Sequence, residues 1–231
     1  LVASVDVAIT TDTRQTEEIL FEFSIPPGVC TMAAFGPHIC ALSRDTDSLC
    51  AFSPDDGALC LCAPAGIYPR DFSVSPCGRY LAVAGSAAGE VILMDRELRC
   101  IRTEKVAGAA IGVCFLPAGL AVLCAMGDEN LSSRLIVIRP RGVTEELFST
   151  QKPPLCLCAL PDGGCLIGCH GQVLRLNGSG RLSGRLSSPL PVRVRTVKGG
   201  ILIADSLNGT VKDGQNHLHY QGKEPTDMCF V

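Results

Sequence analysis

Short apolar runs separated by Gly, Pro, Asp and Ser recur along the whole chain, and no stretch combines length with a sustained helical period. The clearest unit spans residues 69–105, PRDFSVSPCGRYLAVAGSAAGEVILMDRELRCIRTEK. A first apolar strand is followed by a Ser-Pro turn, a second strand at Tyr80–Ala84, a third at Val91–Met94 and a fourth around Cys100–Thr103. Runs this short, bounded by turn residues, predict four strands in tight antiparallel pairing.

The same order returns in other parts of the chain. The first turn and second strand recur at Phe35–Ser43, Leu116–Ala125, Leu160–Cys169 and Val197–Asp205. Third strands follow at Leu49–Phe52, Leu135–Ile138, Val173–Leu176 and Thr210–Lys212. Each of these is followed by a turn sequence such as Asn177-Gly178 or Asp213-Gly214. The chain is therefore a repeat protein whose unit is a four-stranded antiparallel sheet.

The spacing of the first strands predicts how many sheets there are. Equivalent positions are Val29, Asp71, Gly112, Cys156, Arg193 and Asp227, which are 42, 41, 44, 37 and 34 residues apart. If the two chain ends meet in one sheet, the four residues after Asp227 and the first 29 residues together make 33 residues. That is the length of one more repeat. In this arrangement residues 1–25 supply the second to fourth strands of a last sheet, and residues 225–231 supply its innermost strand.

A four-stranded sheet repeated about every 40 residues is typical of a β-propeller blade. We therefore expect one all-β domain over residues 1–231, a propeller with six blades closed by a blade shared between the two termini. The alternatives are a five-bladed ring with loose ends and a larger ring of which this chain is a part.

Composition excludes some classes of function. The chain is 47% apolar and 19% charged, which excludes a disordered tail protein. Its net charge of −3 and its lack of Trp argue against binding of nucleic acid. Residues 106–127 carry no charge and are long enough to span a membrane, but Pro117 interrupts them and they fit the repeat. We expect no membrane contact.

Fourteen cysteines are many for 231 residues. Most lie in apolar runs, Cys60, Cys62, Cys156 and Cys158 among them, which predicts small buried thiols in a reducing compartment. We expect a cytoplasmic protein without cofactor or metal, or, since the chain begins at Leu1, one whose leader has been removed. The alternative is a thiol sensor or metal site at Cys165, Cys169 and His170.

Candidate binding residues lie in loops that a propeller places together on one of its two faces. Loops into the innermost strands share the channel mouth with loops between second and third strands. These positions carry Arg70, Asp71, Arg193 and Asp227 in the first group and Asp45, His170 and Asp205 in the second. Converging charges would bind a polar ligand. Alternatively, Asp71 and Asp227 cap turns, or Arg193 forms a structural ion pair with one of them. No catalytic motif is present, so we assign no catalytic residue.

Asp71, the sequence SPCGRYLAVA and the strand EVILMD together resemble YVTN-type and WD40-like propeller repeats. The pattern is similar to DxAxSPDGRxLYVAN…VxVID, and the chain looks like a distant member of the YVTN/lactonase-like superfamily. The resemblance implies a binding or scaffolding propeller that presents its loop face and channel mouth to a protein or small polar ligand. It also implies an alternative, a lactonase-like hydrolase using Asp71, Asp227, Arg193 and His170.

Overall fold

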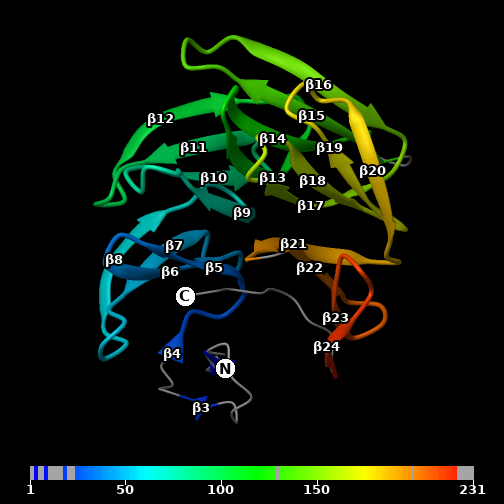
Figure 1. Ribbon diagram of the computed structural model, residues 1–231. Coiled ribbons are helices and arrows are strands. Elements are labelled where there is room, and N and C mark those ends of the chain that lie inside the picture. The colour runs from blue at the N-terminus through cyan, green and yellow to red at the C-terminus, as the bar shows by residue number, and fades with distance from the viewer. Residues whose placement is uncertain are drawn as a thin grey trace.

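A computed structural model of the chain describes residues 3–4, 8–9, 18–19, 24–127, 131–198 and 200–222. Within them, strands alternate with turns throughout, and five of the sheets have four strands each (Figure 1). Every four-stranded sheet is an antiparallel meander in which each strand pairs with its neighbours in sequence. The repeat seen in the sequence is therefore the structural unit.

The five sheets follow one another along the chain. The first contains β5 (Val29–Phe35), β6 (His38–Ser43), β7 (Ser48–Phe52) and β8 (Leu59–Pro64). The second contains β9 (Pro69–Val74), β10 (Leu81–Gly85), β11 (Glu90–Met94) and β12 (Cys100–Lys105). The third contains β13 (Ala109–Leu116), β14 (Gly119–Met126), β15 (Ser132–Ile138) and β16 (Thr144–Thr150). The fourth contains β17 (Pro154–Ala159), β18 (Cys165–Cys169), β19 (Gln172–Leu176) and β20 (Leu182–Ser187). The fifth contains β21 (Pro191–Val197), β22 (Gly200–Asp205), β23 (Thr210–Asp213) and β24 (Leu218–Gln221).

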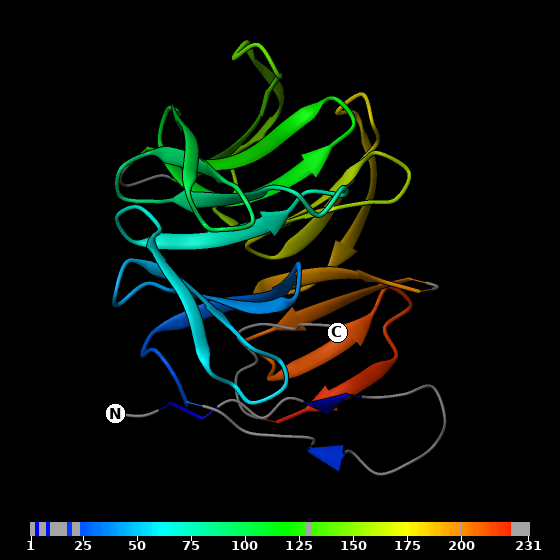
Figure 2. The same ribbon diagram turned by 90° about the vertical axis from the view of Figure 1, so that its left-hand side faces the viewer.

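The sheets are arranged as propeller blades. The first strands β5, β9, β13, β17 and β21 lie innermost, next to one another in chain order, and the fourth strands lie at the rim (Figures 1 and 2). The described residues thus form a β-propeller with five four-stranded blades. The uncharged residues 106–127 contain β13 and β14 of the third blade. Among the described residues no helix is long and apolar enough to span a bilayer.

The prediction of six blades is wrong. Near the N-terminus, β1 (Ala3–Ser4) pairs with β4 (Ser24–Ile25), and β2 (Ala8–Ile9) pairs with β3 (Glu18–Ile19). These are two separate two-stranded sheets. A blade requires each middle strand to pair on both sides, and strands of two residues pair too briefly to build one. Residues 225–231, the predicted innermost strand with Asp227, lie outside the described residues.

The hydrophobic core lies between the blades. Middle strands such as β6, β10 and β18 are buried on both faces, because neighbouring blades cover each side. One apolar cluster joins blades one and two, another joins blades two and three, and a third joins blades three and four. The outermost strands are exposed, and Cys60 and Cys62 on β8 are therefore exposed as well, contrary to our prediction of burial.

Candidate binding site at the channel mouth

Each blade begins with an irregularity that determines which side chains reach the central channel. In every innermost strand the pairing register shifts by one residue near its start, which is a β-bulge. The extra residues are Cys30, Arg70, Ile111, Leu155 and Val192. A bulge changes the direction of one side chain while the rest of the ladder continues.

All five bulge residues line one cavity of about 190 Å³ at the mouth of the channel. Arg44, from the loop between β6 and β7, and Ser206, from the loop between β22 and β23, contribute to the same lining. Every blade thus supplies one side chain at an equivalent position, and the loops add further polar groups. This cavity is the candidate site.

A buried ion pair forms its floor. The residues that follow the bulges form a second layer, in which Arg193 Nη1 lies 2.7 Å from Asp71 Oδ1. The side chains are 5% and 3% exposed, respectively. The second carboxylate oxygen of Asp71 accepts the backbone N–H of Val113 at 3.2 Å. Arg193 also donates to the backbone oxygen of Cys30 at 3.2 Å. The pair and these hydrogen bonds connect the first, second, third and fifth blades across the axis.

Glycine at position 112, beside this network, makes room for the inner strand of the fourth blade. A Cβ built on Gly112 would lie 2.9 Å from the Cβ of Leu157 and 3.5 Å from Oδ2 of Asp71. The first distance is shorter than real Cβ contacts allow, so a side chain here would displace the inner strand of the fourth blade. The absence of a side chain at Gly112 therefore lets the inner strands of the third and fourth blades lie close together.

Two further arginines make the mouth cationic. Arg44 and Arg70 are both partly buried in the cavity lining, and neither forms a salt bridge with another described residue. The guanidinium of Arg44 lies 5.8 Å from the ring centre of Tyr68, within the range of a cation–π contact. The charge of Arg193 is balanced by Asp71, whereas Arg44 and Arg70 add positive charge that a bound anion would balance.

The thiol at the mouth is a poor nucleophile. Burial raises the pKa of Cys30 to about 11, and nearby arginines lower it by less. The Cys30 sulfur contacts the backbone oxygen of Leu42 at 3.5 Å. Near neutral pH this thiol is therefore protonated and contributes to the wall of the cavity.

The predicted site residues separate into three groups. Arg70 and Arg193 line the cavity, and Asp71 lies directly beneath it as the partner of Arg193. Asp45, His170 and Asp205 do not line it. Asp227 lies outside the described residues. Of the two alternative roles predicted for Asp71, the ion pair with Arg193 is confirmed.

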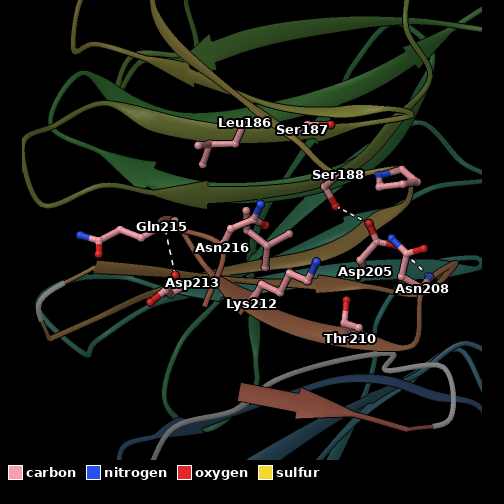
Figure 3. Close-up of a pocket in the computed structure, with 13 residues that line it drawn as sticks. Leu186, Ser187, Ser188, Asp205, Asn208, Thr210, Lys212, Asp213, Gln215 and Asn216 are labelled. Atoms are coloured by element: carbon pink, nitrogen blue, oxygen red, sulfur yellow. Dashed lines mark hydrogen bonds between the residues drawn. The ribbon is translucent and has the colours of Figure 1, made fainter. Parts of the chain in front are cut away.

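Asp205 lies at a different place, a groove of about 280 Å³ between β20 of the fourth blade and strands β22 and β23 of the fifth (Figure 3). Its Oδ2 accepts the hydroxyl of Ser188 at 2.6 Å and the N–H of Leu190 at 3.3 Å. Its Oδ1 accepts the N–H of Asn208 at 3.1 Å. Asp205 is 5% exposed, and its carboxylate holds two loops together through these hydrogen bonds.

The alternative metal site is not formed. Cys165 and Cys169 are buried in the core, whereas His170 is exposed in the following turn. Four residues of extended strand separate the two cysteines by about 13 Å, too far for one ion. Among the described residues no three His, Cys, Asp or Glu side chains are grouped to hold a metal.

Sequence reasoning missed most of the cavity wall, namely Cys30, Ile111, Leu155, Val192 and Ser206. The repeat alignment selected Asp71, Gly112, Cys156 and Arg193, which form the second layer. In the first blade the second-layer residue is Thr31, two positions after the predicted Val29. Each wall residue of an inner strand lies one position before its second-layer neighbour. The wall residues could therefore have been found from the repeat spacing, by taking the position before each second-layer residue. That step requires knowing that every inner strand has a bulge.

Comparison with known proteins agrees with the fold. No family model and no curated protein matches the chain. A chain of a nidogen/laminin complex superposes with a TM-score of 0.71 at 14% identity, covering 92% of this chain and 88% of that one. The β-propeller domain of Swd1 (Cps50) from Myceliophthora thermophila gives 0.63 at 16% identity, covering 80% and 65%. Virginiamycin B lyase from Staphylococcus aureus gives 0.65 at 11% identity, covering 98% and 76%.

The chain spans only about two thirds of the length of some of the matched chains, 65% for Swd1. At identities this low the likeness shows the β-propeller fold alone.

Proposed function

We propose that this propeller is a binding module whose channel-mouth face receives a protein partner, with an acidic group of that partner entering the arginine-lined cavity. The observation that carries the proposal is the pair Arg44 and Arg70 at the rim of a cavity whose floor is already neutralised. A carboxylate placed there would form charge-assisted hydrogen bonds, which contribute about 1.5–3 kcal/mol each.

The surroundings of the cavity favour a protein over a free small molecule. Ile67 and Tyr68, in the loop between β8 and β9, are 60% and 47% exposed, and Leu207, beside Ser206 in the lining, is 69% exposed. All three lie in loops at the same end of the blades as the cavity. Exposed apolar and aromatic side chains around a polar anchor point are typical of protein interfaces. A cavity of about 190 Å³ would accommodate one acidic side chain or a chain terminus.

The fold neighbours support a protein partner in a general way, since one of them is a chain of a nidogen/laminin complex. The more specific relation to YVTN-type repeats rests on residues 69–105 and remains a prediction. A small polar anion is the alternative ligand for the same cavity.

Among the described residues no contact favours the lactonase-like hydrolase. Such an enzyme would need Asp71 as a base, but one of its oxygens accepts from Arg193 and the other from the N–H of Val113. A carboxylate held in this way beneath the cavity is a structural group rather than a poised base.

The proposal is tested by selecting ligands from a random peptide library displayed on phage and measuring each enriched peptide by fluorescence polarisation. We expect enriched peptides to carry Asp, Glu or a free carboxyl terminus beside an apolar residue. Arg44→Ala and Arg70→Ala are expected to weaken binding by roughly 10-fold or more, the equivalent of one charge-assisted hydrogen bond. The matched control is Arg139→Ala, which removes an exposed arginine at the opposite end of the third blade.

Binding that is unchanged in both cavity variants, or equal in the control, contradicts the proposal. A melting-temperature rise with small carboxylates or phosphate, lost in Arg70→Ala, combined with no selected peptide, would assign the cavity to a small anion instead.

A further inference from the structure

Two cysteines of the first blade face each other across neighbouring strands. Cys50 on β7 and Cys62 on β8 are direct partners in the antiparallel register. Their sulfur atoms lie 2.8 Å apart. Cys50 also contacts the hydroxyl of Ser48 at 3.7 Å. The two thiols are therefore in direct contact in the folded blade.

The backbone at this position has the separation that a disulfide needs. The N–H of Ala65 donates to the oxygen of Asp47 at 2.8 Å, which makes that pair a hydrogen-bonded one. Hydrogen-bonded and non-hydrogen-bonded pairs alternate along an antiparallel ladder, so Cys50 and Cys62, three positions further, form a non-hydrogen-bonded pair. The Cα atoms of such pairs are about 4.5 Å apart, within the range for disulfides of about 4.4–6.8 Å.

The two thiols differ in accessibility. Cys62 is exposed on the outermost strand, whereas Cys50 is 3% exposed, and burial raises its pKa to about 11. An oxidant in solution therefore reaches Cys62 first, and Cys50 is placed to react with the product.

We propose that Cys50 and Cys62 form a redox-sensitive site that a hydroperoxide converts into a cross-strand disulfide. The Cys62 sulfur attacks the peroxide, the O–O bond breaks, and Cys62 becomes a sulfenic acid while one molecule of water or alcohol leaves. Burial keeps the Cys50 thiol protonated near neutral pH, but its sulfur is held 2.8 Å from that of Cys62. The Cys50 sulfur attacks the Cys62 sulfur as the S–O bond breaks, and the thiol proton leaves with the hydroxyl group as a second molecule of water. The two sulfur atoms together lose two electrons and the peroxide gains them.

Cys60 provides a matched control within the same strand. It is exposed and lies two residues from Cys62, yet its sulfur contacts the backbone oxygen of Ala58 at 3.4 Å. The register places Leu61 opposite Ala51 and Leu59 opposite Phe52, with a shift between them, so Cys60 has no cysteine opposite. Accessibility alone would make Cys60 as reactive as Cys62, whereas the geometry selects Cys62.

The experiment treats the folded protein with hydrogen peroxide, blocks the remaining thiols and digests without reductant. Both cysteines lie between Arg44 and Arg70 without an intervening Lys or Arg, so trypsin does not separate them. Cleavage before Asp47, Asp55, Asp56 and Asp71 does, because it yields residues 47–54 and 56–70. We expect these two peptides to be joined, with the loss of two hydrogen atoms, in the parent and in Cys60→Ser, but not in Cys62→Ser.

Cys62 is exposed, so its replacement by serine leaves the core intact, and circular dichroism of the variant confirms the fold. Oxidation is also expected to raise the melting temperature of the parent and of Cys60→Ser, because the bond fastens β8 to β7. The proposal fails if peptides 47–54 and 56–70 stay separate in the oxidised parent. It also fails if they remain joined in Cys62→Ser, or if Cys62 ends as a sulfinic acid without a partner.

Discussion

Replacing Asp71 with asparagine tests whether one ion pair holds the centre of the ring together. Asparagine keeps the size of the side chain and removes its charge, so the 2.7 Å ion pair with Arg193 is lost at a position that is 4% exposed. Removing one partner of a buried ion pair lowers the free energy of unfolding by about 3–5 kcal/mol, because the charge that stays buried loses an opposite charge beside it. For a chain of this length each kcal/mol corresponds to about 2–4 °C, so we expect the melting temperature to fall by roughly 6–20 °C.

The assay is thermal unfolding followed by far-ultraviolet circular dichroism, with scanning calorimetry to establish that one transition is observed. The matched control is Arg175→Ala, which breaks the Arg175–Asp162 pair. That pair has the same 2.7 Å separation but is about half exposed, and its loss should cost less than about 1 kcal/mol. A double variant, Asp71→Leu with Arg193→Met, should recover much of the loss, because neither charge remains buried.

Two results would refute this reasoning. One is a melting temperature of Asp71→Asn that equals that of the exposed control. The other is a double variant as unstable as the sum of its single changes, because the two residues would then act independently.

Three further predictions follow from single sites. Gly112→Ala should cost about 1–3 kcal/mol in urea unfolding, because the new Cβ would meet Leu157 at 2.9 Å; an unchanged midpoint would contradict this. Desolvation opposes ionisation of Asp213, but backbone N–H groups and an adjacent imidazole stabilise its carboxylate more strongly and hold its pKa at about 2. Its stabilising effect is present above its unfolded pKa near 4 and is lost as pH falls to about 2, so Asp213→Ala should flatten acid unfolding between these pH values. Hydrogen bonds from Ser75 and then from Arg79 lower the pKa of the exposed Cys77 to about 7, so iodoacetamide should label Cys77 before other exposed thiols at neutral pH. Ser75→Ala removes the largest of these effects and should reduce that preference.

Much of the blade could be predicted from the sequence because its determinants are local. Strands of four to eight residues between Gly, Pro, Asp and Asn specify an antiparallel meander without reference to the rest of the chain. The turn at Asn177 illustrates this, because its side-chain oxygen accepts the N–H groups of Ser179 and Arg181 within the same turn. The regular spacing of such units along the chain also identified the second-layer residues of the second to fifth blades, although not Thr31 in the first.

The number of blades could not be predicted in the same way. Residues 1–25 contain apolar runs that match the repeat, but the structure pairs β1 with β4 and β2 with β3. Whether a terminal segment completes a blade depends on which strands find partners across the whole ring, and this is a property of long-range contacts. Arithmetic on repeat lengths does not contain that information.

The sequence by itself determined the four-stranded unit, its turns and the charged residues near the axis. Short-range strand pairing and turn type depend on residues that are close together in the sequence. The tertiary structure decided which of those residues meet. Arg193 and Asp71 are 122 residues apart and become partners because the ring brings the fifth blade opposite the second. The bulges that turn Arg70 and four other side chains into the mouth, and the contact between Cys50 and Cys62, are matters of register between strands. A shift of one residue in register moves a side chain to the other face, and only the assembled sheets determine it.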